Sequence, residues 1–524
     1  MREFSAGLMA GLCAGVLASA AAAQTLTVMR NLDAPHYDPH RTSAGATGEI
    51  VHLLGDTLVA IDPDLKTIHP LLAKSWTVSA DGKTYTFNLR DDVSFCSGKK
   101  LTAEDVVYSI RRAADPEIKS PFAWRVGRVK HIRAEGPLTV AYELEAPVSE
   151  LLVNLAMFQG VILNKDNVEA LGKDFGIKGF DGTGPYCWES WEPRNQLTMI
   201  RHAAYKWGPK PYSNPGPVKF QKMVWKIVPE ESARVAALLS GQVDISRHMP
   251  HWAIADLRKA PNLQVSDPEA HFNTFYFGFK TSREQVADER VRRAFNMAID
   301  RREIVDALFF GNAIPATTFL HPKVVDFNPR TEEILAKFDP EGAKKLLDEA
   351  GWTTGPDGFR QKDGKRLRPL LYGFAAGMSP KVAEAVQGFL RKIGVDMELQ
   401  MWDSTIVFAK MATQDFDIWS ISYPYTSAGE GMSLYFHSAN RPTPNRMNWD
   451  DKDTDAWIDA GKAALTPEDR ARYFGMVQER VTNAALWLPL VHDNIQLIAN
   501  KKVKGVKAHG FYGHAIYKGL DLSF

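Results

Sequence analysis

The sequence predicts an α/β fold with mixed sheets, divided over two or three lobes, and three observations predict it. The chain has 524 residues, which is more than one ordinary domain holds, so more than one hydrophobic core is expected. Hydrophobic residues make up 45% of the chain and charged residues 24%, which are ordinary values for globular proteins. Stretches with strand periodicity alternate with stretches of helix periodicity, as is typical of α/β proteins.

The charge is almost balanced. The chain has 63 Lys and Arg against 62 Asp and Glu, with a formal net charge of +1. A nucleic-acid-binding protein normally carries a basic excess, so we expect no nucleic-acid partner. The balance also gives no reason to expect a polybasic membrane patch.

The first 23 residues have the pattern of a signal peptide. Arg2 is followed by a run of apolar and small residues from Ala6 to Ala23, which ends in three alanines before Gln24 and offers an A-x-A cleavage site. The run is too short and too rich in alanine for a stable membrane span. Cys13 follows a leucine, where a lipoprotein signal would have a small residue. We expect residues 1–23 to be removed and the rest to be soluble in the envelope.

In the first half of the chain, alternating runs bounded by turn residues predict strands. Asp81-Gly82 separates two such runs, which predicts a hairpin. Thr102 followed by Asp105 is close to a capping box, so a helix is expected to begin there. The expected strands are 25–29, 76–79, 84–89, 138–145, 186–191, 196–201, 219–228 and 243–245, and helices are expected around 51–58, from 102 and over 230–239.

In the second half, alternation resumes at His271, with Thr274 and Tyr276 on one side and Phe275 and Phe277 on the other. Several of the following helix patterns end at a glycine, which is common at helix C-termini. The expected helices are 288–299, 301–309, 340–350, 380–393 and 467–483, with a strand over 395–401 and a strand with a loop over 486–498.

Two cysteines, Cys96 and Cys187, remain after removal of the signal peptide. An oxidising compartment favours a disulfide between them. Two buried, unreactive thiols are the alternative. The separation of their Cα atoms, on which a disulfide depends, does not follow from the sequence, so both interpretations stay open.

Motifs of catalysis are missing from the sequence. There is no G-x-S-x-G, no H-E-x-x-H and no C-x-x-C. Two close histidine pairs each enclose a proline, which breaks the helical spacing that a metal site on a helix needs. We therefore expect a binding protein and no enzyme, with no catalytic residues, no metal and no cofactor. The histidine pairs are His36/His40 around Pro39 and His248/His251 around Pro250.

Short segments, in a fixed order along the chain, resemble the family-5 extracellular solute-binding proteins. This family includes oligopeptide, dipeptide, glutathione, opine and nickel receptors. Most of the matching residues have structural roles: we expect Trp76 and Phe87 in the core, and Asp105 and Asp339 at helix starts. The segments are PLLAKSW (70–76) with SADGKTYTF (79–87) and LTAEDV (101–106), GTGPY (182–186), Arg234, Ala237, Leu238 and Gly241 with VDI (243–245), Asp288 and VR (291–292) with AIDR (298–301), and FDP (338–340) with AKKLLDEAGW (343–352).

The resemblance implies a periplasmic-binding-protein-like, two-lobed clamshell of the cluster C type, with mixed sheets and an extra subdomain. In such a fold the ligand is enclosed when the lobes close. By resemblance, lobe I comprises 24–57, 183–270 and 486–524, the extra subdomain is 58–182, and lobe II is 271–485.

The resemblance also implies, by position, three segments that contact the ligand. The first is the polar loop after Asp38, where small residues let backbone N–H groups approach a ligand closely. The second is the chain crossing near Phe272, and the third comprises two loops of lobe II. The implied ligand-binding residues are Arg41, Thr42, Ser43, Phe272, Asn273, Phe374, Trp402, Asp403, Tyr423, Tyr425 and Thr426.

The third segment departs from the dipeptide receptors. The loop 421–431 has no acidic residue until Glu430, and the run 372–379 has no arginine, so both charged anchors of a dipeptide are missing. An unpaired buried charge would be costly. Aromatic residues take the place of the anchors, which indicates stacking on an opine, a modified amino acid, a peptide or a sugar conjugate. The alternative is that some of these aromatic side chains only pack the lobe.

The function implied by the resemblance is that of the periplasmic substrate-binding component of an ABC importer in a Gram-negative envelope. Its expected partners are a small-molecule ligand and the permease and ATPase of the importer, and we expect a monomer. A nickel or metal-chelate receptor on the same fold is an alternative, and so is a sensor or chaperone. An exported hydrolase is disfavoured by the missing motifs.

Overall fold

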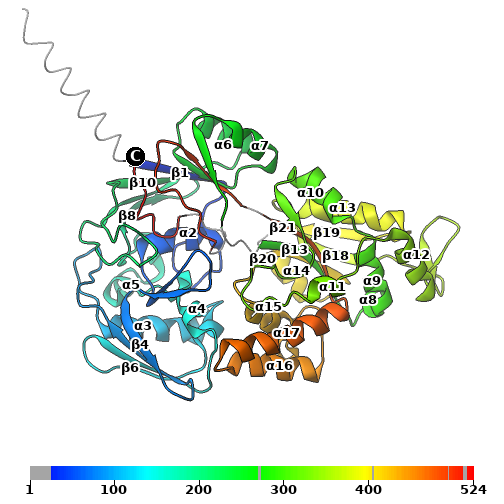
Figure 1. The fold of residues 1–524 in the computed structure, drawn as a ribbon, viewed down its shortest axis with the longest axis horizontal. Helices are drawn as coiled ribbons and strands as arrows, with labels where there is room; N and C mark the ends of the chain where they lie inside the picture. The colour runs from blue at the N-terminus through cyan, green and yellow to red at the C-terminus, as the bar shows by residue number, and fades with distance from the viewer. Residues whose placement is uncertain (1–24, 269–272, 404–405, 494, 511–515) are drawn as a thin grey trace, which may run out of the picture. The chain divides into compact units, whose positions relative to one another are not determined.

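The computed structural model describes residues 25–268, 273–403, 406–493, 495–510 and 516–524. The chain forms two compact units: unit 1 contains residues 1–269 and 495–524, and unit 2 contains residues 270–494. The chain therefore crosses between the units twice (Figure 1). The expected signal peptide and Phe272 lie outside the described residues.

A mixed seven-stranded sheet forms the main layer of unit 1. Its central strand β1 pairs in parallel with β10 and with β11, while the outer strands pair antiparallel. The three parallel strands end at one edge, here called the carboxyl edge of unit 1. In sheet order the strands are β12 (Leu263–Ser266), β22 (Leu497–Asn500), β11 (Ile245–Arg247), β1 (Thr25–Arg30), β10 (Lys222–Ile227), β9 (Gln196–Arg201) and β8 (Tyr186–Glu192).

Two smaller sheets complete the strands of unit 1. The four-stranded one contains the expected hairpin, with Gly82 at φ 68° in its turn, a conformation that suits glycine. Phe87 is buried, whereas Trp76 is only partly buried, because its strand β4 exposes most of its side chains. The strands are β4 (Ala73–Val78), β5 (Thr84–Leu89), β7 (Thr139–Leu144) and β6 (Val129–Ala134) in one sheet, and β2 (Val59–Ile61) and β3 (Ile68–Pro70) in the other.

Some helices of unit 1 begin where polar side chains accept hydrogen bonds from free backbone N–H groups. At α3, the backbone N–H of Thr102 donates to the Asp105 carboxylate, which confirms the expected capping box. The helices are α2 (Gly45–Leu54), α3 (Ala103–Ala114), α4 (Leu151–Leu155), α5 (Lys165–Leu171), α6 (Glu231–Leu239) and α7 (His251–Lys259), with short 3-10 turns η1 (Pro116–Ile118), η2 (Ala123–Val126), η3 (Phe158–Gly160) and η4 (Gly172–Asp174).

A mixed six-stranded sheet forms the main layer of unit 2. Strands β18 and β19 are parallel, as are β18 and β20, whereas β13 runs antiparallel to both of its neighbours, β20 and β21. In sheet order the strands are β14 (Ala313–Pro315), β21 (Trp487–Asp493), β13 (Asn273–Phe279), β20 (Ile418–Pro424), β18 (Leu370–Phe374) and β19 (Glu398–Trp402), and a small sheet contains β15 (Thr353–Thr354), β16 (Arg360–Lys362) and β17 (Lys365–Arg366).

The alternation along β13 places its side chains on two faces of this sheet, as expected. Phe275, Phe277 and Phe279 belong to the large apolar core with residues of α9, α10, α12 and α13. Tyr276 lies on the other face, among buried aromatic side chains. The helices are α8 (Glu284–Ala287), α9 (Glu289–Met297), α10 (Arg301–Phe309), α11 (Thr331–Ile334), α12 (Pro340–Glu349), α13 (Ser379–Lys392), α14 (Val407–Ala412), α15 (Ala428–Phe436), α16 (Lys452–Ala463) and α17 (Pro467–Asn483), with the 3-10 turn η5 (Ser438–Asn440).

One segment lies in a different unit from the expected one. Residues 486–494 were expected in lobe I, but β21 pairs with β13 and β14 in the sheet of unit 2. The next strand, β22, pairs with β11 and β12 in unit 1. The single strand-and-loop pattern over 486–498 therefore contains two strands that belong to different sheets.

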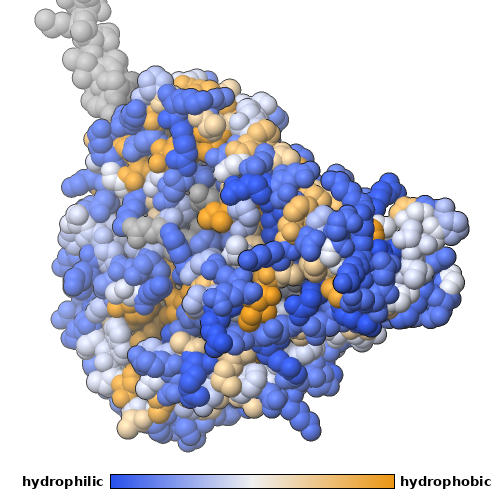
Figure 2. Space-filling view, turned by 45° about the vertical axis from the view of Figure 1, so that its right-hand side comes forward, coloured by the Kyte–Doolittle hydropathy of each residue, from blue (hydrophilic) through white to orange (hydrophobic). Residues whose placement is uncertain are grey.

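On the face drawn in Figure 2, hydrophilic residues predominate and hydrophobic ones lie in small separate patches. Over the part of the chain that the structure describes, the helices are too short or too polar for any of them to span a bilayer.

Candidate functional site

The sheet topology of unit 2 brings the expected site residues to one edge. Strands β18, β19 and β20 run in parallel, and β21 has the same direction because both β20 and β21 are antiparallel to β13. All four strands therefore end at the same edge, here called the carboxyl edge of unit 2, where β13 begins. Ligands of α/β proteins commonly bind outside the carboxyl ends of strands.

Phe374 and Trp402 lie opposite each other at the ends of β18 and β19. Phe374 contacts Phe408 of α14 edge-on, with ring centroids 5.5 Å apart. The Lys410 ammonium lies 4.5 Å from the ring centroid of Trp402, close enough for a cation–π interaction. Phe374 and Trp402 are only partly buried, and the adjacent Asp403 is exposed. These residues form an accessible aromatic surface with a cation beside it.

Tyr423 and Thr426 bind the buried carboxylate of Glu430. Thr426 donates its N–H and its hydroxyl to one oxygen of Glu430, at 3.0 and 2.8 Å. The Tyr423 hydroxyl donates to the other oxygen at 3.3 Å. Glu430 lies in the first turn of α15, so its charge is also favoured by the helix dipole. Glu430, the first acidic residue of the loop, thus stabilises the start of helix α15.

Tyr425 is fully buried and lies within an aromatic cluster. Its hydroxyl is hydrogen-bonded to that of Tyr276, and its ring lies 5.0 Å from that of Phe319. For Tyr425 the structure therefore favours the packing role that was the alternative to ligand stacking. Asn273, at the start of β13, accepts a hydrogen bond from Ser422 at 2.8 Å and is only partly buried.

A histidine pair at the carboxyl edge of unit 2 was not predicted by any motif. The rings of His321 and His492 lie 4.9 Å apart, and His492 Nδ1 lies 2.9 Å from the Thr274 hydroxyl. Both side chains are buried, and burial lowers the pKa of His321 to about 4. These histidines are 171 positions apart (492 minus 321), and no spacing rule connects residues so distant.

In unit 1 the polar loop Arg41–Ser43 is the exposed approach to helix α2. Arg41 and Ser43 are exposed and Thr42 is partly buried, with its hydroxyl accepting the Ala44 N–H at 3.0 Å. Behind the loop, Arg112 binds both carboxylate oxygens of Asp38, at 2.9 and 2.6 Å. The hydrogen bonds and charge of Arg112 help to keep the pKa of Asp38 below its usual value, although burial opposes this.

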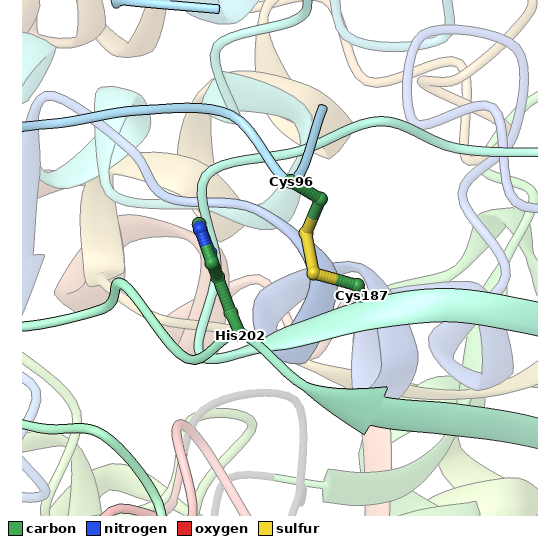
Figure 3. Close-up of side chains that lie close together, drawn as sticks. All are labelled: Cys96, Cys187 and His202. Carbon is green, nitrogen blue, oxygen red and sulfur yellow. A yellow bond between two sulfur atoms is a disulfide. The ribbon is translucent and has the colours of Figure 1, made fainter. Parts of the chain in front are cut away.

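Cys96 and Cys187 are joined by a disulfide in the structure (Figure 3). His202 lies beside them, and its Nδ1 is 2.9 Å from the backbone oxygen of Gly184. The two sulfurs and a nitrogen of His202 lie within 4.8 Å of one another. Bonded sulfurs cannot act as thiolate ligands, so the disulfide excludes a Cys2His metal site in this state.

Comparisons with known proteins identify the family of the chain and agree with its fold. Residues 67–443 match the family described as bacterial extracellular solute-binding proteins, family 5. The match covers more than two thirds of the chain. The protein belongs to family 5 of the bacterial extracellular solute-binding proteins.

Curated relatives of this family-5 protein align over almost their whole length. The glutathione-binding protein GsiB of Salmonella typhimurium is 26% identical over 510 residues, which cover 94% of each chain. The heme-binding protein A of Haemophilus influenzae is 26% identical over 500 residues, which cover 91% of this chain and 88% of the relative. The two relatives are named for unlike ligands, so the ligand does not follow from family-5 membership.

Solved structures show the same fold for this family-5 chain. NikA from Brucella suis in complex with Fe(III)-EDTA has a TM-score of 0.84 at 24% identity, and the match covers 95% of this chain and 99% of NikA. AgaA in complex with agropinic acid, from A. tumefacien R10, has a TM-score of 0.79 at 23% identity, covering 95% and 98%. The expected fold class is thereby confirmed.

Proposed function

We propose that this protein is the periplasmic substrate-binding component of an ABC importer and captures a polar organic solute without chemical conversion. Its ligand is an opine, a modified amino acid, a peptide or a sugar conjugate. The permease and the ATPase of the importer are its partners, and the protein acts as a monomer that is exported by residues 1–23.

The chain belongs to a solute-binding family, and its candidate residues in unit 2 lie at one edge of a sheet. This combination is the observation that carries the proposal. Phe374, Trp402 and Tyr423 come from three different strands and lie at one sheet edge. Partly buried aromatic side chains stack well on flat or weakly polar ligand groups. The curated relatives named above are binding proteins, which supports a role without catalysis.

Thermal melting of the full chain against a ligand panel tests the proposal. The panel contains glutathione, tripeptides, dipeptides, opines, sugar conjugates and heme. A ligand present at a hundred times its Kd adds about 2.7 kcal/mol to the unfolding free energy, which raises the Tm by a few degrees. A saturable shift with one class and no turnover of that ligand is the expected result. Turnover of the bound compound, or no shift with any member, would contradict the proposal.

A metal-chelate receptor is the second candidate, and His321 with His492 favours it. Imidazole nitrogens are common ligands of nickel and iron, and this pair lies at the carboxyl edge of unit 2. Nickel added with free histidine tests this candidate. A Tm shift that His321→Gln abolishes would support it, whereas a shift that persists in the variant would count against it.

A further inference from the structure

Two buried arginines lie side by side at the carboxyl edge of unit 1. In the parallel pair β1 and β11, Val28 lies opposite Ile245 and Met29 opposite Ser246. The next position on each strand is its last residue, Arg30 and Arg247. Both side chains are almost completely buried, at 1% and 4% exposed.

One carboxylate is shared between these two arginines. Glu49 of α2 binds Arg30 Nη1 with one oxygen, at 3.1 Å, and pairs with Arg247 Nη1 through the other. Arg30 has further acceptors: Ala46 O at 2.6 Å and Asp33 Oδ1 at 3.1 Å. Asp33 also accepts hydrogen bonds from Trp191, at 3.0 Å, and from other donors, so it offers little to Arg247.

Arg247 is therefore the less well compensated of the two cations. In the described parts of the chain the Nε atoms of both arginines lack a hydrogen-bond partner, but Arg30 donates from Nη1 and Nη2 to Ala46 O, Glu49 and Asp33. Burial of an unsatisfied guanidinium donor is costly. Burial, together with the charge of Arg30, lowers the pKa of Arg247 to about 9. An added anion nearby would oppose both effects, because it would stabilise the protonated guanidinium.

The position of this group connects it with the loop in front of α2. The Arg30 guanidinium donates to the backbone oxygen of Ala46, in the first turn of α2, and the exposed residues Arg41 and Ser43 precede that turn. Arg30 and Arg247 thus bind to helix α2, which follows the loop 41–43 that is expected to contact the ligand. A guanidinium edge with a free Nε–H is suited to bidentate binding of a carboxylate or a phosphate.

We propose that Arg247, supported by Arg30 and Glu49, is an anion subsite that selects ligands with a carboxylate or phosphate group. This inference rests on the proposed function and specifies the ligand class.

Paired probes test this subsite in the full wild-type chain by calorimetry. Each pair has an anionic member and a counterpart in which an anionic group is masked or absent: glutathione and its diethyl ester, a tripeptide and its C-terminal amide, an opine and its methyl ester, and glucose 6-phosphate and glucose. We expect the anionic member of the bound pair to bind about 10- to 100-fold more tightly, the range that one charge-assisted hydrogen-bonded contact supplies. Equal affinity of both members would overturn the proposal and leave the proposed function intact.

Variants of Arg247 test whether the preference for the anionic probe depends on this residue. Arg247→Gln should weaken the anionic member about 10-fold or more and leave the neutral member within about twofold, while Arg247→Lys should retain part of the preference. Arg133→Gln is the matched control, because Arg133 is exposed and paired with Glu135 on the four-stranded sheet. If Arg247→Gln weakens both members equally, Arg247 is a structural residue and the subsite is refuted. If the wild-type chain binds no member and purifies without any bound ligand, the proposed function fails as well.

Discussion

Trp402 and Tyr425 were both expected to contact the ligand, but their surroundings differ. Tyr425 is fully buried among Tyr276, Phe319 and Tyr435. Trp402 is only partly buried and ends its strand at the carboxyl edge of unit 2. A side chain that completes a core and one that faces the ligand should respond differently to truncation.

Tyr425→Ala should lower the unfolding free energy by about 3–5 kcal/mol, because it removes a large buried aromatic ring. Trp402→Ala should cost less stability and should weaken the ligand found in the panel about 3- to 10-fold through lost stacking. Urea unfolding and calorimetry on the two variants provide the measurements. An unchanged ligand affinity in Trp402→Ala would show that the aromatic surface is not part of the site.

The disulfide connects two elements that are distant in sequence. Cys96 precedes helix α3, and Cys187 lies on β8, 91 positions later. The bond therefore closes a long loop that contains strands β6 and β7 of the four-stranded sheet and helices α3 to α5. In the chain-entropy model such a cross-link stabilises the fold mainly by restricting the unfolded chain.

Replacing both cysteines by serine should lower the unfolding free energy by about 4–5 kcal/mol, as expected for a loop of this length. Denaturant unfolding of the wild-type chain with and without reductant measures the same difference. The reductant should have no effect on the double variant, which is the control. A wild-type chain whose stability is insensitive to complete reduction would contradict this stabilising role.

At the scale of the whole molecule, buried histidines predict a loss of stability in acid. Burial lowers the pKa of His40, His321 and His509 to about 4 each, against about 6.5 in an unfolded chain. Between these two values the unfolded state binds more protons, so the unfolding free energy falls as the pH falls. Above pH 6.5 this contribution is constant.

The denaturation midpoint should therefore be nearly constant between pH 7 and 8 and should fall steadily from pH 6.5 towards pH 4. His509→Gln removes one titrating group while its amide can still donate to the backbone oxygen of Ile61, which lies 3.1 Å from His509 Nε2. Its midpoint should fall less steeply over this pH range. A midpoint that rises between pH 6.5 and pH 5 would contradict the assignment of these histidines as neutral in the folded state.

Local patterns were sufficient for most of the elements. The helices α10 and α17 have the expected ranges, and α13 differs from the expected range by one residue at each end. Asp300 and Thr466 cap the first two by accepting N–H groups of the first turn. These features depend on residues within a few positions of one another, so the sequence contains them directly.

The candidate site was only partly predictable. Phe374, Trp402 and Tyr423 were found through resemblance, and the structure places them at one edge. Tyr425 was not distinguished from them, because an aromatic residue in a loop gives no indication of its burial. His321, His492 and Arg247, for which binding roles are proposed above, were not predicted, since their partners lie on strands or loops that are far away in sequence.

By itself the sequence determined the α/β class, the family and the residue types available for binding, because periodicity, caps and short motifs are local properties. Only the tertiary structure decided which distant residues meet. It placed Arg30 and Arg247 at the ends of the neighbouring strands β1 and β11, assigned β21 and β22 to different sheets, and joined Lys518 to Asp56 in a fully buried ion pair at 2.6 Å. The physical reason is that strand order and burial depend on the packing of the whole chain, and no local pattern encodes them.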